Sequence, residues 1–545
     1  MSLLPGQMMQ MPLLISSLIT HAARHSGDVE IVSRRVEGDL HRYTWAEAEL
    51  RARKLAQALA RLGCQAGDRV GTLAWNGYRH LEIYYGTSGS GLLCHTVNPR
   101  LFPQQIAWII NDAADRILCF DLNLLPLVEQ IAADCRTVQH FVLLAGRAQL
   151  PDQTTIPGLL CYEDMVAAED GDMTWPTFDE TTAAGICYTS GTTGDPKGAV
   201  YSHRSTVLHS YAAAMPDAMN LSARDVVLPV VPMFHVNAWG LPYATAMVGC
   251  KVVFPGPHLD GKSLYELFEA EQVTFSAGVP TVWMGLLAHM QTHQLKFSSF
   301  RCTVIGGAAC PASMIDTLVD DFGVEVIHAW GMTELSPLGT LSRLRGKHLG
   351  LPKDEQRRLM AKQGKAPYGI DLRIVDGAGA PLPWDGKAAG ELMVKGHWVI
   401  SDYFRTPKSP LQDGWFPTGD VATIDGDGFM QITDRSKDVI KSGGEWISSI
   451  ALENLAVGHP AVQQAAVISV AHPQWGERPL LTVVLKPGAA VTREALLAFY
   501  EGKVPNWQVP NDVIFLPELP QTATGKIQKL RLREAFRNHQ WSQPG

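Results

Sequence analysis

The sequence predicts an α/β protein with a large N-terminal domain of helix-covered, mainly parallel sheets, a small β-rich subdomain and a smaller α+β C-terminal domain. Three observations support this fold class. The chain has 545 residues, which is enough for two to four domains at roughly 150 residues each. Before about residue 370, short β-branched runs alternate with helical stretches, as in a parallel sheet covered by helices. Beyond that point, short strands follow one another with Gly/Asp turns between them, which is typical of antiparallel structure.

The elements predicted first along the chain belong to the large domain. A helix is expected over residues 44–62, because Thr44 and Glu47 form a capping-box pair and apolar residues recur three and four positions apart. Gly63 follows, where a left-handed residue commonly ends a helix. Short apolar runs of the kind that a sheet buried on both faces requires predict strands. These runs cover residues 226–231, 251–254, 302–305 and 324–327.

The second half of the chain contains the β-rich subdomain and the C-terminal domain. The subdomain is expected at about residues 370–433, as the last part of a large domain that spans 1–433. A domain boundary is predicted at 434–438, and the C-terminal domain, at 439–545, has a size that is common for a domain. The strands predicted in the subdomain cover residues 371–375, 391–394 and 429–433.

Composition excludes several classes of protein. Lys and Arg number 46 and Asp and Glu 54, and the resulting net charge of −8 argues against a nucleic-acid-binding protein. The nine cysteines contain no C-x-x-C pair, so neither a disulfide framework nor a zinc site is expected. No apolar stretch approaches the roughly 18 to 20 residues of a membrane-spanning helix, and no signal peptide is predicted. We therefore expect a cytoplasmic enzyme with at most peripheral contact with the inner face of a membrane.

The most informative segment covers residues 188–198 and has the sequence Y-T-S-G-T-T-G-D-P-K-G. Its glycines allow close approach of the backbone, and its hydroxyls and lysine suit anionic oxygens. It is not a Walker A loop, because Pro196 precedes the lysine and Gly198 follows it. The segment predicts a phosphate-binding loop, with a polar surface turn as the alternative. The residues assigned to phosphate binding are Thr189, Ser190, Gly191, Thr192, Thr193, Gly194 and Lys197.

Two further clusters follow predicted strands, where α/β folds bind ligands. The first is the flexible turn G-G-A at 306–308, and the second is H-A-W-G-M-T-E at 328–334. A purine could stack on Trp330, although packing is the simpler role for this residue. Glu334 suits Mg²⁺, which prefers oxygen ligands and usually takes one or two protein carboxylates.

Three downstream segments complete the pattern. The sequence T-G-D ends in Asp420, whose carboxylate can accept hydrogen bonds from both ribose hydroxyls; an isolated T-G-D is otherwise a turn. The run D-R-S-K-D-V-I-K-S-G-G-E-W covers 434–446. Near the C-terminus, T-A-T-G-K ends in Lys526, which could reach an anionic intermediate, although a lone lysine is usually just solvated.

In this order and spacing, the segments resemble the adenylate-forming superfamily of acyl-CoA synthetases, luciferases and peptide-synthetase adenylation domains, over about residues 44–529. Within it, P-M-F-H-V-N-A-W at 232–239 and K-S-G-G-E-W-I-S at 441–448 are similar to bacterial medium- and long-chain fatty-acid CoA ligases, especially those of alkane degradation. The resemblance implies that a medium- to long-chain fatty acid and MgATP form an acyl-adenylate and pyrophosphate, and that coenzyme A then displaces AMP. ATP, Mg²⁺ and CoA are therefore the expected cofactors and co-substrates.

Carried over residue by residue, the resemblance assigns roles around the nucleotide. The loop from Thr189 to Lys197 would hold the β- and γ-phosphates, and Thr189 and Glu334 would surround Mg²⁺. Thr333 would contact the α-phosphate, and Lys526 would bridge it to the substrate carboxylate in the first half-reaction. The candidate catalytic residues are Lys526, Glu334, Thr333 and Lys197. The adenine and ribose sites would be formed by Gly307, His328, Ala329, Trp330, Gly331, Asp420 and Arg435. Many relatives have Tyr or Phe at the position of Trp330, so stacking is expected there without a phenolic hydrogen bond.

The acyl chain requires an apolar tunnel, since each buried CH₂ contributes about 0.8 kcal/mol. In similar enzymes a tryptophan at the position of Trp239 gates this tunnel, with core filling as the alternative role. His235 falls where the family has a histidine near the acyl carboxylate and the thiol path, and no base role is assigned to it. Further candidates for the tunnel are Val231, Phe234, Val236, Val279, Thr281 and Trp283.

The resemblance also predicts a mobile C-terminal domain. Lys437 falls at the hinge position within 434–438, where rotation would withdraw Lys526 and bring a second face over the site. Lys441 and Trp446 of that domain are assigned to cofactor binding. Because similar bacterial enzymes are often homodimers through the large domain, a homodimer is one option for this chain.

Three other functions remain as alternatives. A peptide-synthetase adenylation module would pass its acyl group to a carrier protein, but only 545 − 526 = 19 residues follow Lys526, too few for a fused carrier domain. A luciferase-like oxygenase shares the motifs and is disfavoured by the segments around Trp239 and Trp446. A non-catalytic nucleotide- or lipid-binding protein is disfavoured because every charge that the chemistry needs is present in the sequence.

Overall fold

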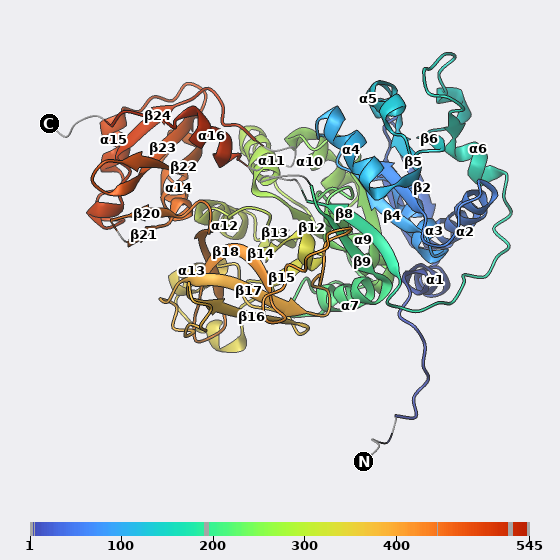
Figure 1. The fold of residues 1–545 in the computed structure, drawn as a ribbon, viewed down its shortest axis with the longest axis horizontal. Coiled ribbons are helices and arrows are strands. Elements are labelled where there is room, and N and C mark those ends of the chain that lie inside the picture. The colour runs from blue at the N-terminus through green and yellow to red at the C-terminus, as the bar shows by residue number, and fades with distance from the viewer. Residues whose placement is uncertain (1–3, 5, 190–195, 444, 522–526, 542–545) are drawn as a thin grey trace.

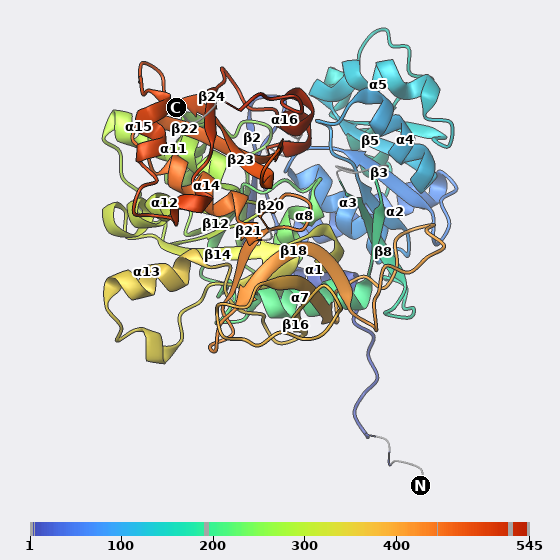
Figure 2. The same cartoon turned by 60° about the vertical axis from the view of Figure 1, so that its left-hand side comes forward.

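The computed structural model describes residues 4, 6–189, 196–443, 445–521 and 527–541. Figures 1 and 2 show a large domain built from the N-terminal and central parts of the chain, and a smaller C-terminal domain beside it. In both views the chain before the first helix runs away from the large domain. Within the residues described, the strands form four sheets.

The first sheet of the large domain has the strand order β7-β6-β5-β3-β4-β8-β9. Its neighbouring strands are parallel except for the antiparallel pair β8 and β9, which flanks residues 189–197. This pair brings together Thr189 and Lys197, the described residues on the two sides of 190–195. The strands are β3 (Arg69–Leu73), β4 (Leu93–Thr96), β5 (Asp115–Asp121), β6 (His140–Leu144), β7 (Leu160–Cys161), β8 (Ala183–Tyr188) and β9 (Gly198–Ser202).

The second sheet has the order β15-β14-β13-β12-β10-β11-β1-β2. It is parallel in its centre, and the pairs β14–β15 and β1–β2 at its two edges are antiparallel. The predicted strands at 251–254 and 302–305 are confirmed at the residues expected. The strands are β1 (Glu30–Arg34), β2 (Leu40–Thr44), β10 (Val226–Pro229), β11 (Lys251–Phe254), β12 (Phe275–Gly278), β13 (Cys302–Ile305), β14 (Glu325–Gly331) and β15 (Leu338–Leu341).

Helices cover both faces of these two sheets, as the fold class predicts. The largest apolar core lies between the sheets and includes residues from α1 (Ile15–His25), α2 (Trp45–Arg61), α3 (Tyr78–Gly89), α7 (His203–Ala214) and α9 (Leu241–Val248). On the outer face of the first sheet pack α4 (Pro103–Ala113) and α5 (Leu125–Ile131). On the outer face of the second sheet pack α10 (Gly261–Ala270), α11 (Pro280–His293) and α12 (Ala312–Asp316). The remaining helices of this domain are α6 (Tyr162–Ala167), α8 (Val236–Trp239) and α13 (Lys353–Ala361).

The helix predicted over residues 44–62 is α2. Thr44 accepts a hydrogen bond from the backbone N–H of Glu47, and the Glu47 side chain accepts one from the Thr44 N–H, so the capping box is formed. Gly63 has a φ of 81°, the left-handed conformation expected where the helix ends. Local sequence signals therefore define this helix at both ends.

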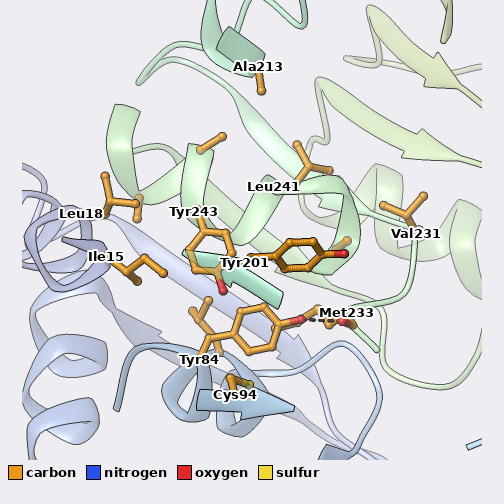
Figure 3. Close-up of a cluster of buried hydrophobic side chains, with 14 of the residues drawn as sticks. Ile15, Leu18, Tyr84, Cys94, Tyr201, Ala213, Val231, Met233, Leu241 and Tyr243 are labelled. Carbon is orange, nitrogen blue, oxygen red and sulfur yellow. Dashed lines mark hydrogen bonds between the residues drawn. The ribbon is translucent and has the colours of Figure 1, made fainter. Parts of the chain in front are cut away.

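Buried tyrosines connect the central core to two loops that line the functional site. Figure 3 shows Tyr84, Tyr201 and Tyr243 packed among aliphatic side chains. The Tyr84 hydroxyl donates to the Met233 carbonyl, and the Tyr201 hydroxyl donates to the Thr333 carbonyl at 2.7 Å. Buried tyrosine hydroxyls usually find such partners. Here the bonds fix the loops that follow β10 and β14.

The β-rich subdomain is an antiparallel sheet in the order β16-β17-β18-β19, composed of β16 (Ile370–Val375), β17 (Gly390–Gly396), β18 (Phe416–Ile424) and β19 (Met430–Arg435). The C-terminal domain has its own sheet, in which helices cover both faces. On one face pack α14 (Ser449–Val457) and α15 (Arg493–Ala498), and on the other α16 (Lys529–Ala535). The strands of this sheet are β20 (Ile440–Ser442), β21 (Glu445–Ile447), β22 (Val462–His472), β23 (Gly476–Leu485) and β24 (Asp512–Phe515).

None of the helices in the described part of the chain combines the length and apolar character needed to cross a membrane.

Candidate active site

A cleft of about 1490 Å³ runs between the large domain, the β16–β19 sheet and the C-terminal domain. Many of the residues that the motifs predicted line this cleft, although they are far apart in sequence. They are Thr189, Lys197, His235, Val236, Trp239, Gly307, His328, Ala329, Trp330, Gly331, Thr333, Glu334, Asp420, Arg435 and Lys437. Ser190, Gly191, Thr192, Thr193, Gly194 and Lys526 lie outside the described residues.

One corner of the cleft joins Trp330 at the end of β14 to Asp420 of β18. The indole Nε1–H donates to Asp420 Oδ2 at 2.9 Å, and the Arg435 Nε–H donates to Oδ1 at 3.0 Å. One face of the indole lies against Gly339, where a Cβ would come 2.4 Å from the ring. The carboxylate is thus held from two sides and keeps lone pairs for further donors. The sequence predicted that a phenolic hydrogen bond is absent at position 330, and the structure shows that the indole supplies a hydrogen bond of its own.

His328, which also lines the cleft, is held in place by its own hydrogen bonds. It is 1% exposed, and burial lowers the pKa of its imidazole to about 4. The ring is therefore neutral at pH 7: Nδ1–H donates to the Ala361 carbonyl at 2.8 Å, and Nε2 accepts the backbone N–H of Cys310 at 3.3 Å. Both ring nitrogens are occupied by backbone groups, so the ring itself is a structural element beside the corner formed by Trp330 and Asp420.

A second corner brings together the phosphate-loop ends and a carboxylate. The Thr189 N–H donates to the Lys197 carbonyl at 2.9 Å, and the Lys197 N–H donates to Thr189 Oγ1 at 3.2 Å, which closes the hairpin across the loop. Glu334 is 6% exposed and accepts a hydrogen bond from the Tyr403 hydroxyl at 2.6 Å. The Lys197 ammonium lies 5.0 Å from the centroid of the Tyr403 ring. A cation and an anion therefore border the same part of the cleft.

The residues at this corner fit magnesium. The described part of the chain holds no group of three or more His, Cys, Asp or Glu residues that could enclose a metal ion. Magnesium does not require one, because it keeps several waters and is commonly bound through one or two carboxylates together with substrate phosphates. Glu334 and the Thr189 hydroxyl supply oxygen atoms of the kind it prefers, and both residues line the cleft.

A further part of the cleft wall, here called the apolar end, is lined by hydrophobic side chains. They are Val230, Val231, Phe234, Val236, Trp239, Leu259, Val279, Val282 and Met284. Trp239 lies over the turn after β13, since a Cβ at Gly306 would come 3.2 Å from its ring. Trp283, also predicted for the tunnel, does not line the cleft, and that prediction is wrong. It is fully buried beneath the second sheet and stacks on Phe300 with ring centroids 5.8 Å apart.

The apolar end contains an unusual left-handed turn. The four residues of α8, from Val236 to Trp239, have φ angles between 46° and 56°, and a left-handed conformation costs a non-glycine residue roughly 1–2 kcal/mol. Asn237 is central to this turn: its Oδ1 accepts the Cys187 thiol at 3.1 Å, and its Nδ2 donates to the Tyr243 hydroxyl at 3.5 Å. The turn places Trp239 at the cleft.

Polar contacts join the large domain to the C-terminal domain. Asp434 at the end of β19 accepts the Ser449 N–H at 2.6 Å and the Ser449 Oγ–H at 2.9 Å. Within the C-terminal domain, Lys529 donates to Ser449 Oγ and forms an ion pair with Glu453, both at 2.7 Å. Burial, followed by the nearby Arg435 charge, lowers the pKa of Lys437.

Two predicted cofactor-binding residues lie elsewhere on the C-terminal domain. Lys441 does not line the cleft; its backbone N–H donates to Glu477 at 2.9 Å. The backbone of Trp446 pairs with Lys441 across the β20–β21 hairpin. The Trp446 side chain is outside the described part of the structure.

Sequence reasoning missed the contacts of Tyr403 and Tyr201, which reach site residues far away in sequence, and those of Asn237, which holds the turn next to Trp239. Tyr403 is 69 residues from Glu334, and Tyr201 is 132 residues from Thr333. A single tyrosine, in a loop like Tyr403 or in a strand like Tyr201, carries no chemical signal of its own, so these contacts emerge only when the chain is folded.

Two family models match the chain. The AMP-binding enzyme family matches residues 18–404, and the AMP-binding enzyme C-terminal domain matches residues 451–526. The first model matches more than half of the chain, so the chain belongs to the AMP-binding enzyme family. The resemblance to the adenylate-forming superfamily inferred from the motifs is thereby confirmed.

Relatives with assigned names match over nearly the whole chain. The chain is 55% identical to the 3-methylmercaptopropionyl-CoA ligase of Ruegeria lacuscaerulensis, covering 98% of this chain and 99% of the relative. It is 53% identical to the medium-chain-fatty-acid–CoA ligase of Ectopseudomonas oleovorans, covering 97% of each, and 45% identical to the long-chain-fatty-acid–CoA ligase of Thermus thermophilus, covering 99% and 98%.

A solved structure shows the same fold. The ATP-bound MatB structure from Rhodopseudomonas palustris superposes with a TM-score of 0.80 at 26% identity, covering 96% of this chain and 99% of that one.

Proposed function

We propose that this chain is an AMP-forming acid–CoA ligase whose substrates are medium- to long-chain fatty acids. The observation that carries the proposal is that one cleft collects Trp330 and Asp420 at one corner, Lys197 and Glu334 at another, and a hydrophobic wall at its apolar end. These are the three kinds of surface that a nucleoside, a triphosphate and an aliphatic carboxylic acid require. The names of the relatives described above support the same reaction class.

The first half-reaction joins a carboxylate oxygen to the α-phosphorus of ATP and releases pyrophosphate. A carboxylate is a poor nucleophile, and the reacting phosphorus becomes crowded with negative charge, so catalysis depends on positioning and electrostatic stabilisation. In this proposal Asp420 and Arg435 hold the ribose, Trp330 contacts the adenine, and Lys197 and Thr189 bind the outer phosphates. Thr333 contacts the α-phosphate, and Lys526 supplies a positive charge to the carboxylate and the α-phosphate.

Magnesium, when bound at Glu334 and Thr189, would neutralise phosphate charge during this step. The second half-reaction breaks the mixed anhydride: the CoA sulfur attacks the acyl carbon and AMP leaves. No base is assigned for the thiol. His235 lies at the cleft wall beside the apolar end, and Lys437, at the predicted hinge, lines the same cleft.

A specific observation favours a second candidate for the acyl substrate. Two relatives, at 55% and 54% identity, are named 3-methylmercaptopropionyl-CoA ligases, so a short acid containing a thioether is the alternative substrate. The apolar end favours the longer chain, because Leu259, Val282 and Met284 lie among its lining residues and would otherwise have no acyl group to contact.

The test is pyrophosphate release with straight-chain acids from three to fourteen carbons, with and without CoA, alongside 3-methylmercaptopropionate. Each CH₂ that enters an apolar site contributes about 0.8 kcal/mol, or about fourfold in kcat/KM. A fatty-acid ligase shows this rise over several carbons, whereas a ligase for the short thioether acid shows its maximum at 3-methylmercaptopropionate.

Two further measurements separate the remaining alternatives. Acyl-CoA formation in the presence of CoA distinguishes a ligase from a carrier-protein adenylation module. If none of the acids tested causes release of pyrophosphate, the chain is a binding protein and not a ligase. The variant Lys526→Ala is expected to lose adenylation. Unchanged adenylation in that variant would contradict the role given to this lysine.

A further inference from the structure

Tyr403 contacts two oppositely charged groups of the candidate active site at once. It lies in the loop between β17 and β18. Its hydroxyl donates to Glu334 Oε1 at 2.6 Å, and the face of its ring lies 5.0 Å from the Lys197 ammonium. The residue also lines the cleft. One side chain therefore touches both the candidate metal-binding carboxylate and the candidate phosphate-binding lysine.

The backbone on both sides of Tyr403 is tied to the segments that carry these groups. The Ile400 N–H donates to the Glu334 carbonyl at 3.0 Å, and the Phe404 N–H donates to the Gly198 carbonyl at 2.8 Å, one residue beyond Lys197. The ring also meets Phe416 edge-on, with centroids 6.3 Å apart. The loop is thus held by bonds that do not involve the phenol hydroxyl, so removing that hydroxyl alone should leave the loop in place.

The two contacts orient charges without neutralising them. A phenol donates one hydrogen bond to a carboxylate and leaves its negative charge intact, and a ring face attracts an ammonium without occupying its N–H donors. A tyrosine phenol has an ordinary pKa of about 10, so the Tyr403 hydroxyl is a donor at neutral pH. Both charges therefore stay available to a ligand in the cleft.

We propose that Tyr403 is a positioning residue for the metal–triphosphate site: its hydroxyl fixes the Glu334 carboxylate toward the metal, and its ring holds Lys197 toward the phosphates. The inference rests on the proposed function, since it takes ATP with magnesium as the ligand of this corner. It adds a residue that acts through two others and does not itself touch the reacting atoms.

The two contacts can be separated by substitution. Tyr403→Phe removes the hydroxyl and keeps the ring, whereas Tyr403→Leu removes both. Tyr368, which is 84% exposed in the same region of the chain, provides Tyr368→Phe as the matched control. The measurement is Mn²⁺ binding by electron paramagnetic resonance to the enzyme saturated with α,β-methylene-ATP, which cannot be cleaved at the reacting bond. Binding of the analogue without metal is measured by calorimetry in EDTA.

A hydrogen bond to a charged group corresponds to roughly a tenfold or greater change in affinity. We expect Tyr403→Phe to weaken Mn²⁺ binding by about tenfold and to leave metal-free binding of the analogue unchanged. Tyr403→Leu should also weaken metal-free binding, because Lys197 loses its contact. Tyr368→Phe should change neither. Mn²⁺ affinity of Tyr403→Phe within about twofold of wild type would overturn the proposal.

A double-mutant cycle with Glu334→Gln supplies a second criterion. If the hydroxyl acts through Glu334, adding Tyr403→Phe to Glu334→Gln causes no further loss of Mn²⁺ affinity; a full further loss would overturn the proposal. Because these measurements use no carboxylic acid, they are independent of the acyl assignment. A wild-type enzyme that binds the metal complex but forms no acyl-adenylate with any acid counts against the proposed function alone.

Discussion

Replacing Trp330 with phenylalanine should weaken ATP binding by disturbing the proposed ribose site at Asp420, while the proposed stacking on the adenine is retained. The indole Nε1–H donates to Asp420 Oδ2 at 2.9 Å, and phenylalanine has no donor to replace it. Phenylalanine still presents an aromatic ring toward Gly339. Asp420 would then be held only by Arg435, at 3.0 Å, and its carboxylate could turn away from the ribose hydroxyls.

The size of the effect follows from the charge of the acceptor. Hydrogen bonds to charged groups contribute about 1.5–3 kcal/mol. Trp330 is only partly buried and Asp420 is 7% exposed beside an open cleft, so the lower limit applies. About 1.4 kcal/mol corresponds to a tenfold rise in the KM for ATP. The ribose is remote from the reacting phosphorus, so kcat should stay within about threefold of wild type.

The assay is pyrophosphate release with ATP and with 2′-deoxy-ATP, on wild type, Trp330→Phe and the control Trp384→Phe, whose indole is 46% exposed. If Asp420 recognises the ribose through the geometry that Trp330 enforces, the preference for ATP over the deoxynucleotide should fall in Trp330→Phe and stay constant in the control. An unchanged KM together with an unchanged preference would refute this reasoning.

Three other substitutions test separate parts of the structure. Gly339→Ala places a Cβ 2.4 Å from the Trp330 ring, so it should raise the KM for ATP at least as much as Trp330→Phe; an unaltered KM would show that the ring can move without consequence. Asn237→Val puts a β-branched residue at a φ of 52° and should lower the free energy of unfolding in urea by about 1–2 kcal/mol more than Asn237→Gly, and equal losses would contradict strain at this turn. Burial lowers the pKa of His328 to about 4, so between pH 6.5 and 4 only the unfolded state takes up the proton and stability falls with falling pH. From pH 7 to pH 5 the loss in free energy of unfolding is about 2 kcal/mol. Urea unfolding of wild type and of His328→Gln at both pH values measures it, and the fall in unfolding free energy should be smaller in the variant by this amount. An equal fall in both proteins would refute the assignment.

The parts of the fold that could be predicted from sequence are those specified by short-range patterns. The strands Lys251–Phe254 and Cys302–Ile305 are runs of buried residues with no competing period, and α2 carries its own capping box. The left-handed turn at 236–239 could not be predicted in this way. It contains no glycine, and its φ angles are imposed by Asn237, whose partners Cys187 and Tyr243 come from β8 and α9.

The same distinction between short-range patterns and long-range contacts applies to the candidate site. Motif chemistry supplied the types of residue, because hydroxyls, glycines and a lysine in one loop suit phosphate, and a carboxylate suits a ribose or a metal. What the sequence could not supply is which atoms meet. The bond between Trp330 and Asp420 spans 90 residues, and it adds to the predicted stacking role of Trp330 that of a donor that orients a carboxylate.

The contacts between the two domains favour the predicted rotation at 434–438, which stays a prediction. The bonds that reach the C-terminal domain from the end of β19 and from the hinge are those of Asp434 with Ser449 and of Asp438 with Arg533, the latter at 2.5 Å. Asp434 and Ser449 are buried in this orientation. If a rotation brings water to both, each hydrogen bond is exchanged for bonds to water at a net cost of about 1 kcal/mol, whereas separating an apolar interface would expose area at about 25 cal/mol per Å². Meanwhile the apolar clusters of the C-terminal domain lie on the two faces of its own sheet. The domain can therefore turn as a unit without opening its core, and the polar contacts at its edge are the ones that a second orientation must replace.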